Sequence, residues 1–171
     1  MTFREVLESR YSVRKFAPDP VPADKLAAVL EAIRVAPSAK NLQPVRYRIF
    51  TTPEELALVD ACTPCRYGAP AVLLFCYDDE VAWKKEGRPD AGPVDVSIAC
   101  TYAMLEAANQ GLGSVWVMNA DCAKLRELLS LPPRILPICL LPFGFAAPDA
   151  EPGPMHARRV PLEAMRLREE A

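Results

Sequence analysis

The feature of this sequence that most constrains its fold is an unbroken run of seven apolar residues at 71–77. A strand that faces water on one side alternates apolar and polar residues, whereas a continuous apolar run is typical of a strand buried on both faces. Such a strand needs a covering layer on each side of its sheet. We therefore expect a three-layer domain of the α+β or α/β class, with helices packed against a central sheet.

The remaining elements can be predicted from capping, turn and periodicity signals. Helices are predicted at 2–9, 22–36, 52–61 and 93–110. A further helix is predicted to begin after an N-cap at Asn119 or Asp121 and to end at Leu129. Strands are predicted at 45–51, 71–77 and 114–118, and in the middle of 135–143, where Pro137 and Pro142 should prevent full pairing. This order of elements gives about four core strands.

A chain of 171 residues fits a single domain, which we assign to the whole of 1–171. Residues 146–154 are rich in Pro, Ala and Gly without periodicity, so an extended arm is predicted there, followed by a short helix at 161–169. In so small a domain the arm, 146–171, has little to pack against. We expect it to reach a second subunit and hence a homodimer.

Composition argues against several classes of function. The formal net charge is −2, without the basic excess of a general nucleic-acid-binding protein, so no nucleic acid is expected as a partner. No apolar run approaches the length of a membrane span, and the first residues lack the apolar region of a signal peptide. We expect a cytoplasmic protein without membrane association.

No metal site and no common catalytic motif is predicted. Cys62 and Cys65 are spaced as in redox or zinc sites, but the single histidine, His156, is distant and no second such pair exists, so structural cysteines are favoured. The sequence has no P-loop, no dinucleotide-binding glycine motif and no G-x-S-x-G elbow. If the protein is an enzyme, we expect a cofactor to carry the reaction.

A basic stretch near the N-terminus suits a phosphate monoester. Arg10, Ser12 and Arg14 alternate, so in an extended segment their side chains face the same side. Two guanidiniums and a hydroxyl on one face can bind a phosphate, although a solvated basic turn has the same residues. The pair Arg158-Arg159 offers further donors.

The polar loop at 38–44 offers amide groups. Asn41 and Gln43 each provide a donor and an acceptor, which suit the alternating carbonyl and N–H groups at the pyrimidine edge of a flavin. A cation beside that edge would stabilise the anion of the reduced flavin, and Arg14 could serve there instead of at the phosphate.

Four sequence blocks in this order resemble the nitroreductase family of FMN flavoproteins, and together they span nearly the whole chain. The blocks are Arg10-x-Ser12-x-Arg14-x-Phe16, Pro37-Ser38-x-x-Asn41-x-Gln43-Pro44, Gly111-Leu112-Gly113-Ser114-Val115-Trp116 and Arg159-Val160-Pro161-Leu162. The resemblance implies an α+β three-layer sandwich with a central, mostly antiparallel sheet flanked by helices. It also implies an intertwined homodimer that exchanges C-terminal arms and holds two FMN molecules at its interface.

Carried over residue by residue, the resemblance assigns the cofactor site. Ser38 and Asn41 would contact the flavin ring from the partner subunit, and Arg159 would close on the phosphate. Gly113 would either allow close approach of the isoalloxazine or only cap a helix. The implied cofactor-binding residues are Arg10, Tyr11, Ser12, Arg14, Pro37, Ser38, Ala39, Asn41, Gln43, Gly113, Arg158 and Arg159.

The activity that the resemblance implies is an FMN-dependent oxidoreductase. It would pass a hydride from NAD(P)H through flavin N5 to a nitroaromatic, a quinone or a similar small-molecule acceptor, and the shared site predicts ping-pong kinetics. No side chain need act as acid or base, so no catalytic residue is assigned.

Departures from the family pattern leave the substrate open. Val45 stands where tryptophan is common, Tyr11 where a second basic residue is common, and the loop at 78–93 is short. Within that loop, residues 83–85 form either a reduced lid or a solvated surface. The alternatives are flavin-fragmenting or dehalogenating chemistry on the same fold, a sensor or flavin store, and a non-enzymatic protein that binds flavin or another phosphorylated ligand.

Overall fold

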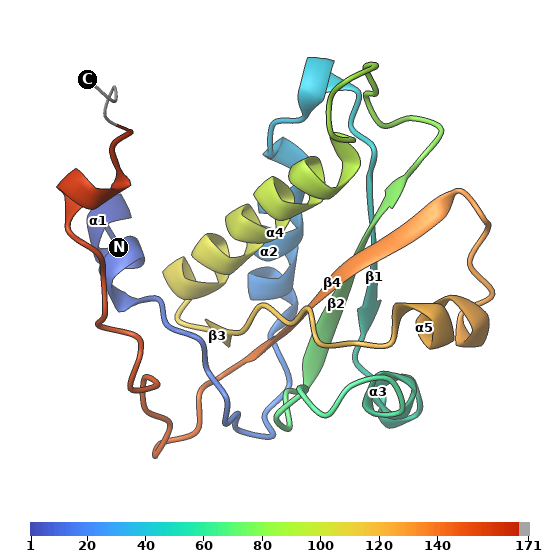
Figure 1. The fold of residues 1–171 in the computed structure, drawn as a ribbon. Helices are drawn as coiled ribbons and strands as arrows, with labels where there is room; N and C mark the ends of the chain where they lie inside the picture. The colour runs from blue at the N-terminus through green and yellow to red at the C-terminus, as the bar shows by residue number, and fades with distance from the viewer. Residues whose placement is uncertain (168–171) are drawn as a thin grey trace.

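A four-stranded sheet lies at the centre of the computed structural model, which describes residues 1–167 (Figure 1). The strand order is β1-β2-β4-β3. The strands are β1 (Val45–Phe50), β2 (Ala71–Asp78), β3 (Gly113–Ser114) and β4 (Ile135–Gly144). All neighbouring strands are antiparallel, which confirms the expected α+β class and the mostly antiparallel sheet.

Helical segments cover the sheet, and capping boxes form at the starts of two of the predicted helices. The segments in the described residues are α1 (Phe3–Ser9), α2 (Ala23–Val35), the 3-10 turn η1 (Ala39–Asn41), α3 (Pro53–Asp60), α4 (Gly92–Asn109), α5 (Cys122–Leu128) and the 3-10 turn η2 (Leu162–Met165). At α1 and α3, the hydroxyl of Thr2 or Thr52 accepts from the backbone N–H of the glutamate three residues later. Within residues 1–167, no helix has both the length and the apolar character needed to cross a membrane.

The apolar run at 71–77 lies in β2, and every residue of that strand is buried. Alternate side chains of β2 enter different halves of the core. Leu73 and Phe75 pack on the side of α2 and α4, whereas Val72 and Leu74 pack on the side of α3 and α5. The expected three layers are therefore present, and burial on both faces explains why the run lacks polar residues.

The pairing of β4 differs from the sequence-based prediction. Pro137 and Pro142 both lie inside the β2–β4 ladder, which runs from Ile135 to Phe143. Its one register shift falls between the pairs that Pro137 and Cys139 form. The carbonyl of Pro142 accepts from the N–H of Val115 at 3.1 Å, on the β3 side of the strand. Because N–H and C=O of one residue face the same neighbour in an antiparallel pair, the missing N–H of Pro142 affects that side and spares the ladder with β2.

The same proline accounts for the short β3. The prediction of a strand at 114–118 is wrong in length, because the ladder covers only Gly113–Ser114 and is followed by one isolated bridge between Val117 and Leu140. Pro142 cannot donate to the segment that follows Ser114, so continuous pairing ends there. The helix predicted at 161–169 is also shorter, being η2 alone, and its last two predicted positions lie outside the described residues.

Candidate functional site

The segment 10–16 extends the sheet beyond β3. Ser12 forms a parallel bridge with Ser114, and the N–H of Val13 donates to the carbonyl of Ser114 at 3.0 Å. Phe16 forms an antiparallel bridge with Ala146, which follows β4. These bridges hold the segment in the extended conformation that side-chain alternation requires.

The side chains of this segment divide into buried apolar and accessible polar ones. Tyr11 and Val13 pack on the core, where Val13 is only 1% exposed. Arg10 and Ser12 are half-buried, and Arg14 is exposed. The Nη1 atom of Arg14 donates to the carbonyl of Ser12 at 3.4 Å, so its guanidinium stays close to the extended backbone. The three polar residues thus alternate with the buried ones as the sequence predicts.

Gly113 has a packing role that the sequence did not indicate. A Cβ atom at Gly113 would lie 2.5 Å from Cγ2 of Val13, far inside a normal contact distance. Segment 10–16 can therefore approach β3 only because Gly113 has no side chain. The alternative of a helix cap is wrong for Gly113, because Gly111 with φ +74° makes the left-handed turn after α4. Contact of Gly113 with an isoalloxazine stays a prediction.

A small cavity of about 250 Å³ lies beside Arg10, between the segment 10–13 and the C-terminal end of α4. Its lining combines polar atoms with small and apolar side chains. The lining residues include Arg10, Tyr11, Ala108, Leu112, Gly113 and Ser114. A guanidinium at the edge of a partly apolar hollow is an arrangement that an anion can occupy.

Residues 146–156, the first part of the predicted C-terminal arm, pack against segment 10–16 of their own chain. Lys15 forms an ion pair with Asp149, and the N–H of Ala147 donates to the carbonyl of Lys15 at 3.0 Å. The hydroxyl of Tyr11 donates to the carbonyl of Ala150 at 3.3 Å, so this group has a structural partner. The extended segment 10–16 supplies the packing surface that the sequence did not suggest.

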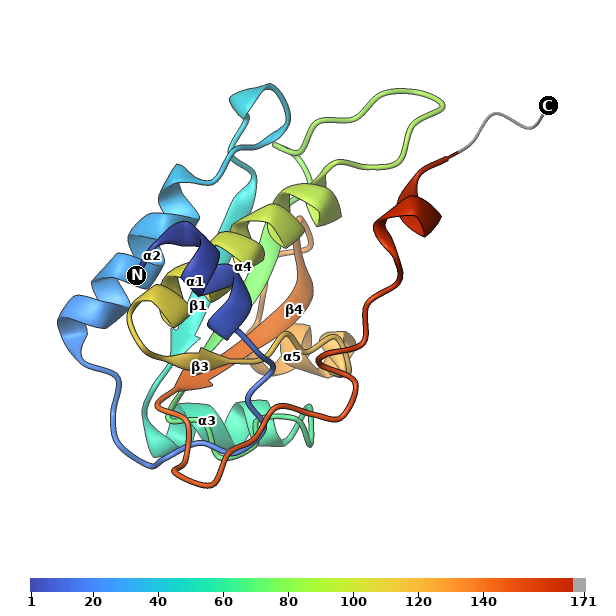
Figure 2. The same cartoon turned by 90° about the vertical axis from the view of Figure 1, so that its left-hand side faces the viewer.

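Residues 157–167 are all exposed and run away from the sheet (Figure 2). Arg158 and Arg159 lie at the start of this exposed stretch. The guanidinium of Arg159 donates to backbone carbonyls of its own segment, one of them that of Arg158 at 2.8 Å. The predicted closure of the two arginines on a phosphate stays a prediction.

The loop 38–43, which contains η1, has a strained backbone. Lys40, Asn41 and Gln43 have φ angles of 52°, 56° and 53°, in the left-handed region that non-glycine residues avoid at a cost of about 1–2 kcal/mol each. Within the loop, the hydroxyl of Ser38 accepts from the N–H of Gln43 at 2.9 Å. The side chains of Asn41 and Gln43 are exposed. Strain of this kind is concentrated at binding sites, and here the strained loop exposes two amides at the surface.

The two halves of the predicted site lie at opposite ends of α4 (Figure 1). The loop 38–43 contacts the first turn of α4, where Ala39 donates its N–H to Asp95 at 2.9 Å. Segment 10–16 contacts Gly113, just after the other end of the helix. With 18 residues, α4 is about 27 Å long. One chain therefore does not bring the two halves together around a single flavin.

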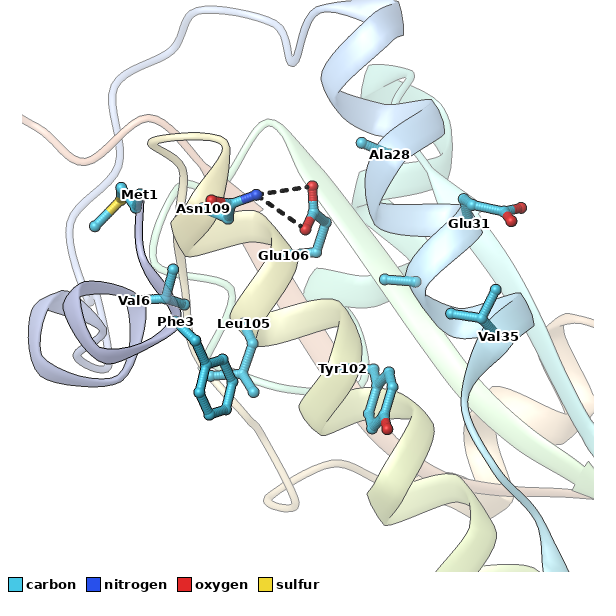
Figure 3. A pocket seen from close by; sticks show the side chains of 11 residues that line it. Met1, Phe3, Val6, Ala28, Glu31, Val35, Tyr102, Leu105, Glu106 and Asn109 are labelled. Atoms are coloured by element: carbon cyan, nitrogen blue, oxygen red, sulfur yellow. Dashed lines mark hydrogen bonds between the residues drawn. The ribbon is translucent and has the colours of Figure 1, made fainter.

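An open groove of about 700 Å³ lies on the helical side of the molecule (Figure 3). Side chains from α1, α2 and α4 line it, and several of them are apolar and exposed. Phe3 is 68% exposed and Val35 is 54% exposed. The lining also includes Val6, Ala28, Glu31, Tyr102, Leu105 and Asn109. Exposed apolar residues gathered in a groove are typical of a surface that binds a partner or a ligand.

Sequence reasoning missed Asp95 as part of the site. Its carboxylate is 2% exposed and contacts the loop, as described above. A signal was present, because Asp95 is spaced by four residues from Ala99, and then from Ala103 and Ala107, which form the buried stripe of α4. A carboxylate on an otherwise apolar stripe needs a polar partner.

Among the cysteines whose thiol pKa is shifted, Cys65 is the one whose pKa is lowered. A hydrogen bond with the hydroxyl of Tyr67 lowers the pKa of Cys65, with smaller effects of the same sign from Thr63, Asn119 and the nearby Arg14. Burial instead raises the pKa of Cys62. In residues 1–167 no three His, Cys, Asp or Glu side chains are grouped as metal ligands would be.

Comparisons with known proteins give one consistent result. The model of the nitroreductase family matches residues 7–67 and 61–145. The crystal structure of a nitroreductase family protein from Clostridium difficile 630 aligns over 100% of both chains with a TM-score of 0.92 and 32% identity. The FMN reductase (NAD(P)H) of Bacillus subtilis is 30% identical over 182 residues, which cover 95% of this chain and 72% of that protein. An FMN-dependent nitroreductase from Clostridium difficile R20291 has a TM-score of 0.72 and 27% identity over 85% of this chain and 88% of its own.

Proposed function

Since this chain belongs to the nitroreductase family, we propose that it is an FMN-dependent oxidoreductase that uses NAD(P)H. Relatives named for FMN and for NAD(P)H support this activity. The observation in the chain itself that carries the proposal is the extended segment 10–16, in which two arginines and a serine alternate with packed residues. Of the three polar residues, Arg10 also lines the small cavity. That donor set fits a phosphate monoester such as the one in FMN.

The residues present fit the cofactor at both of its polar ends. Arg10 and Ser12 would hold the phosphate, and Arg14 would stabilise negative charge at the phosphate or at the pyrimidine edge. The exposed amides of Asn41 and Gln43 would bind the pyrimidine edge. When bound, FMN would supply the redox chemistry that links hydride donation by NAD(P)H to reduction of an acceptor such as a nitroaromatic or a quinone. No side chain of the chain is assigned as acid or base.

The site is shared between two chains of a homodimer. The distance between the two halves of the site supports a shared site. Loop 38–43 and segment 10–16 of one chain lie at opposite ends of α4, too far apart to bind the same flavin. The apolar groove lined by α1, α2 and α4 supports it as well, since a second copy would cover its exposed side chains. The exposed stretch 157–167, with Arg158 and Arg159, would close the site after dimerisation.

One site for both reactants implies ping-pong kinetics, in which oxidised nicotinamide leaves before the acceptor enters. The short loop at 78–93 would leave the site open to acceptors of varied shape. In initial-rate measurements, plots of reciprocal rate against reciprocal NAD(P)H concentration at several quinone concentrations should be parallel. Intersecting lines would indicate that both reactants bind together.

The decisive experiment is the visible spectrum of the purified protein, with chromatographic identification of any released cofactor. Bound FMN and steady oxidation of NADH or NADPH with a quinone would support the proposal. FMN binding without turnover would favour a flavin store or sensor. A colourless protein that does not take up added FMN, but binds another phosphorylated compound, would replace the proposed activity with a binding function.

A further inference from the structure

We propose that Asp95 is a positioning residue that holds loop 38–43 in the conformation the cofactor site requires. This role rests on the function proposed above, because the loop acts on the reaction only if its amides contact FMN. Neither Asp95 nor any part of α4 belongs to the residues expected to touch the cofactor.

Loop 38–43 needs stabilising contacts with the rest of the domain because its backbone is strained. Three of its residues, Lys40, Asn41 and Gln43, have positive φ, and such conformations persist only where surrounding contacts fix them. The hydrogen bond from the N–H of Gln43 to the hydroxyl of Ser38 closes the loop on itself but does not tie it to α4. Among the described residues, the bond from the N–H of Ala39 to Oδ1 of Asp95 is the one hydrogen bond between this loop and α4.

The burial of Asp95 is explained by this bond. The side chain is 2% exposed, and its Oδ2 atom has no hydrogen-bond partner in the described part of the chain. Burying a carboxylate is unfavourable unless its hydrogen bonds compensate, and an alanine would fit the small-residue stripe of α4 equally well. The positive end of the helix dipole, in the first turn of α4, favours the charge at that position. The hydrogen bond to the N–H of Ala39 is therefore the stabilising contact that a carboxylate at position 95 makes and an alanine cannot make.

A second contact from the same part of the chain supports the loop. The ammonium group of Lys40 lies 5.9 Å from the centre of the Trp83 ring, within cation–π range. The carbonyl of Trp83 accepts from the N–H of Ala91 at 3.2 Å, just before α4 begins. Residues 83–95 therefore brace loop 38–43 at two points, and the short loop at 78–93 serves as a support for that loop.

The test compares Asp95→Ala with Asp95→Asn. Asparagine keeps an oxygen that can accept from Ala39, whereas alanine removes the acceptor. We expect Asp95→Ala to raise the Kd for FMN by about tenfold and to change the visible spectrum of the bound flavin. Asp95→Asn should stay within about threefold of wild type. Thr52→Ala is the control, since it removes a side-chain-to-backbone hydrogen bond at α3, away from the loop.

Hydrogen–deuterium exchange on the protein without FMN separates this role from the proposed function. A peptide covering 38–43 should exchange faster in Asp95→Ala than in wild type or Asp95→Asn. If Asp95→Ala does not fold, Ala39→Pro removes the same bond from the donor side, and proline suits the first position of a helical turn. Ala39→Pro should then reproduce the faster exchange.

Three results would overturn the role of Asp95. One is unchanged exchange in loop 38–43 after loss of the Ala39 bond. Another is an equal loss of FMN affinity in Asp95→Ala and Asp95→Asn, which would indicate a need for the charge itself. The third is an equal loss in Thr52→Ala, which would indicate general destabilisation. If wild type does not bind FMN, the proposed activity fails, and the exchange data still decide whether Asp95 holds the loop.

Discussion

At the scale of single residues, Arg10 is the most informative cation. Its side chain is half-buried, and its guanidinium makes no hydrogen bond or ion pair with another residue in 1–167. A partly buried cation loses hydration, and a bound anion restores the lost interactions. The other basic residues nearby, Arg14 and Lys15, already contact Ser12 and Asp149.

Replacing the arginines tests the phosphate site directly. Arg10→Ala and Arg159→Ala should each weaken FMN binding by about 1.5–3 kcal/mol, the range of a charge-assisted hydrogen bond. Titration of the apoprotein with FMN, followed by flavin fluorescence, measures the change. Arg48→Ala is the control, because Arg48 lies on β1 and pairs with Glu55. Wild-type affinity in both variants would place the phosphate elsewhere.

The thiol of Cys65 should react before the other cysteines. The bond with Tyr67 lowers its pKa, whereas burial raises the pKa of Cys76 to about 12 and also raises that of Cys122. A lowered pKa means that the thiolate fraction rises at lower pH than for an ordinary cysteine. Alkylation by iodoacetamide, followed by mass spectrometry across a pH series, should show Cys65 modified first.

The variant Tyr67→Phe provides the control for this prediction. Loss of the hydroxyl should move the half-point of the Cys65 pH profile upward, toward that of an ordinary cysteine. Earlier modification of the buried Cys76 or Cys100 would contradict the assignment.

At the scale of elements, the close contact between β3 and segment 10–16 depends on Gly113. Gly113→Ala should displace the segment, because its Cβ would collide with Val13, and overpacking of this kind costs about 1–3 kcal/mol. Thermal unfolding and FMN titration should both show the defect. The double variant Gly113→Ala with Val13→Ala should lose less unfolding free energy than the sum of the losses in the two single variants. Strict additivity would mean that the collision does not determine the packing.

The sequence was a good guide to elements whose signals are local. The unbroken apolar run predicted β2 and the layers around it, and capping signals predicted the starts of α1 and α3. Pairing depends on neighbours that are distant in sequence, so the pairing of β4 and the length of β3 were mispredicted. Pro142 leaves one side of β4 without an N–H donor. Which neighbouring strand lies on that side depends on the strand order, which the sequence alone does not give.

In the candidate site, too, local features could be predicted from the sequence and long-range contacts could not. Alternation along 10–14 is a local property and could be predicted. The hold of Asp95 on Ala39 joins residues 56 positions apart, and the packing of 146–156 on segment 10–16 joins even more distant ones. Such contacts follow from the fold, and only the spacing of Asp95 on the alanine stripe pointed to one of them.

At the scale of the whole molecule, the proposed shared site can be tested with mixed dimers. Combine one chain carrying Arg10→Ala with another carrying Asn41→Ala. If each site takes Arg10 from one chain and Asn41 from the other, the mixed dimer contains one intact site and one doubly altered site. It should then bind about one FMN per dimer with wild-type affinity.

The two parent homodimers are the controls, since every site in them carries one substitution. Co-expression with two different affinity tags isolates the mixed species. Failure of the mixed dimer to recover one tight site would show that Arg10 and Asn41 of the same chain serve the same flavin.

The packing of segment 10–16 has a consequence for biosynthesis. Its neighbours are Ser114, Ala146 and Ala150, and the hydroxyl of Tyr11 bonds to a carbonyl 139 residues further along the chain. These contacts have a high contact order, so they form late. While the ribosome is still translating the middle of the chain, the first segment has no strand to join. We therefore expect the nascent chain to capture its cofactor only after translation is nearly complete.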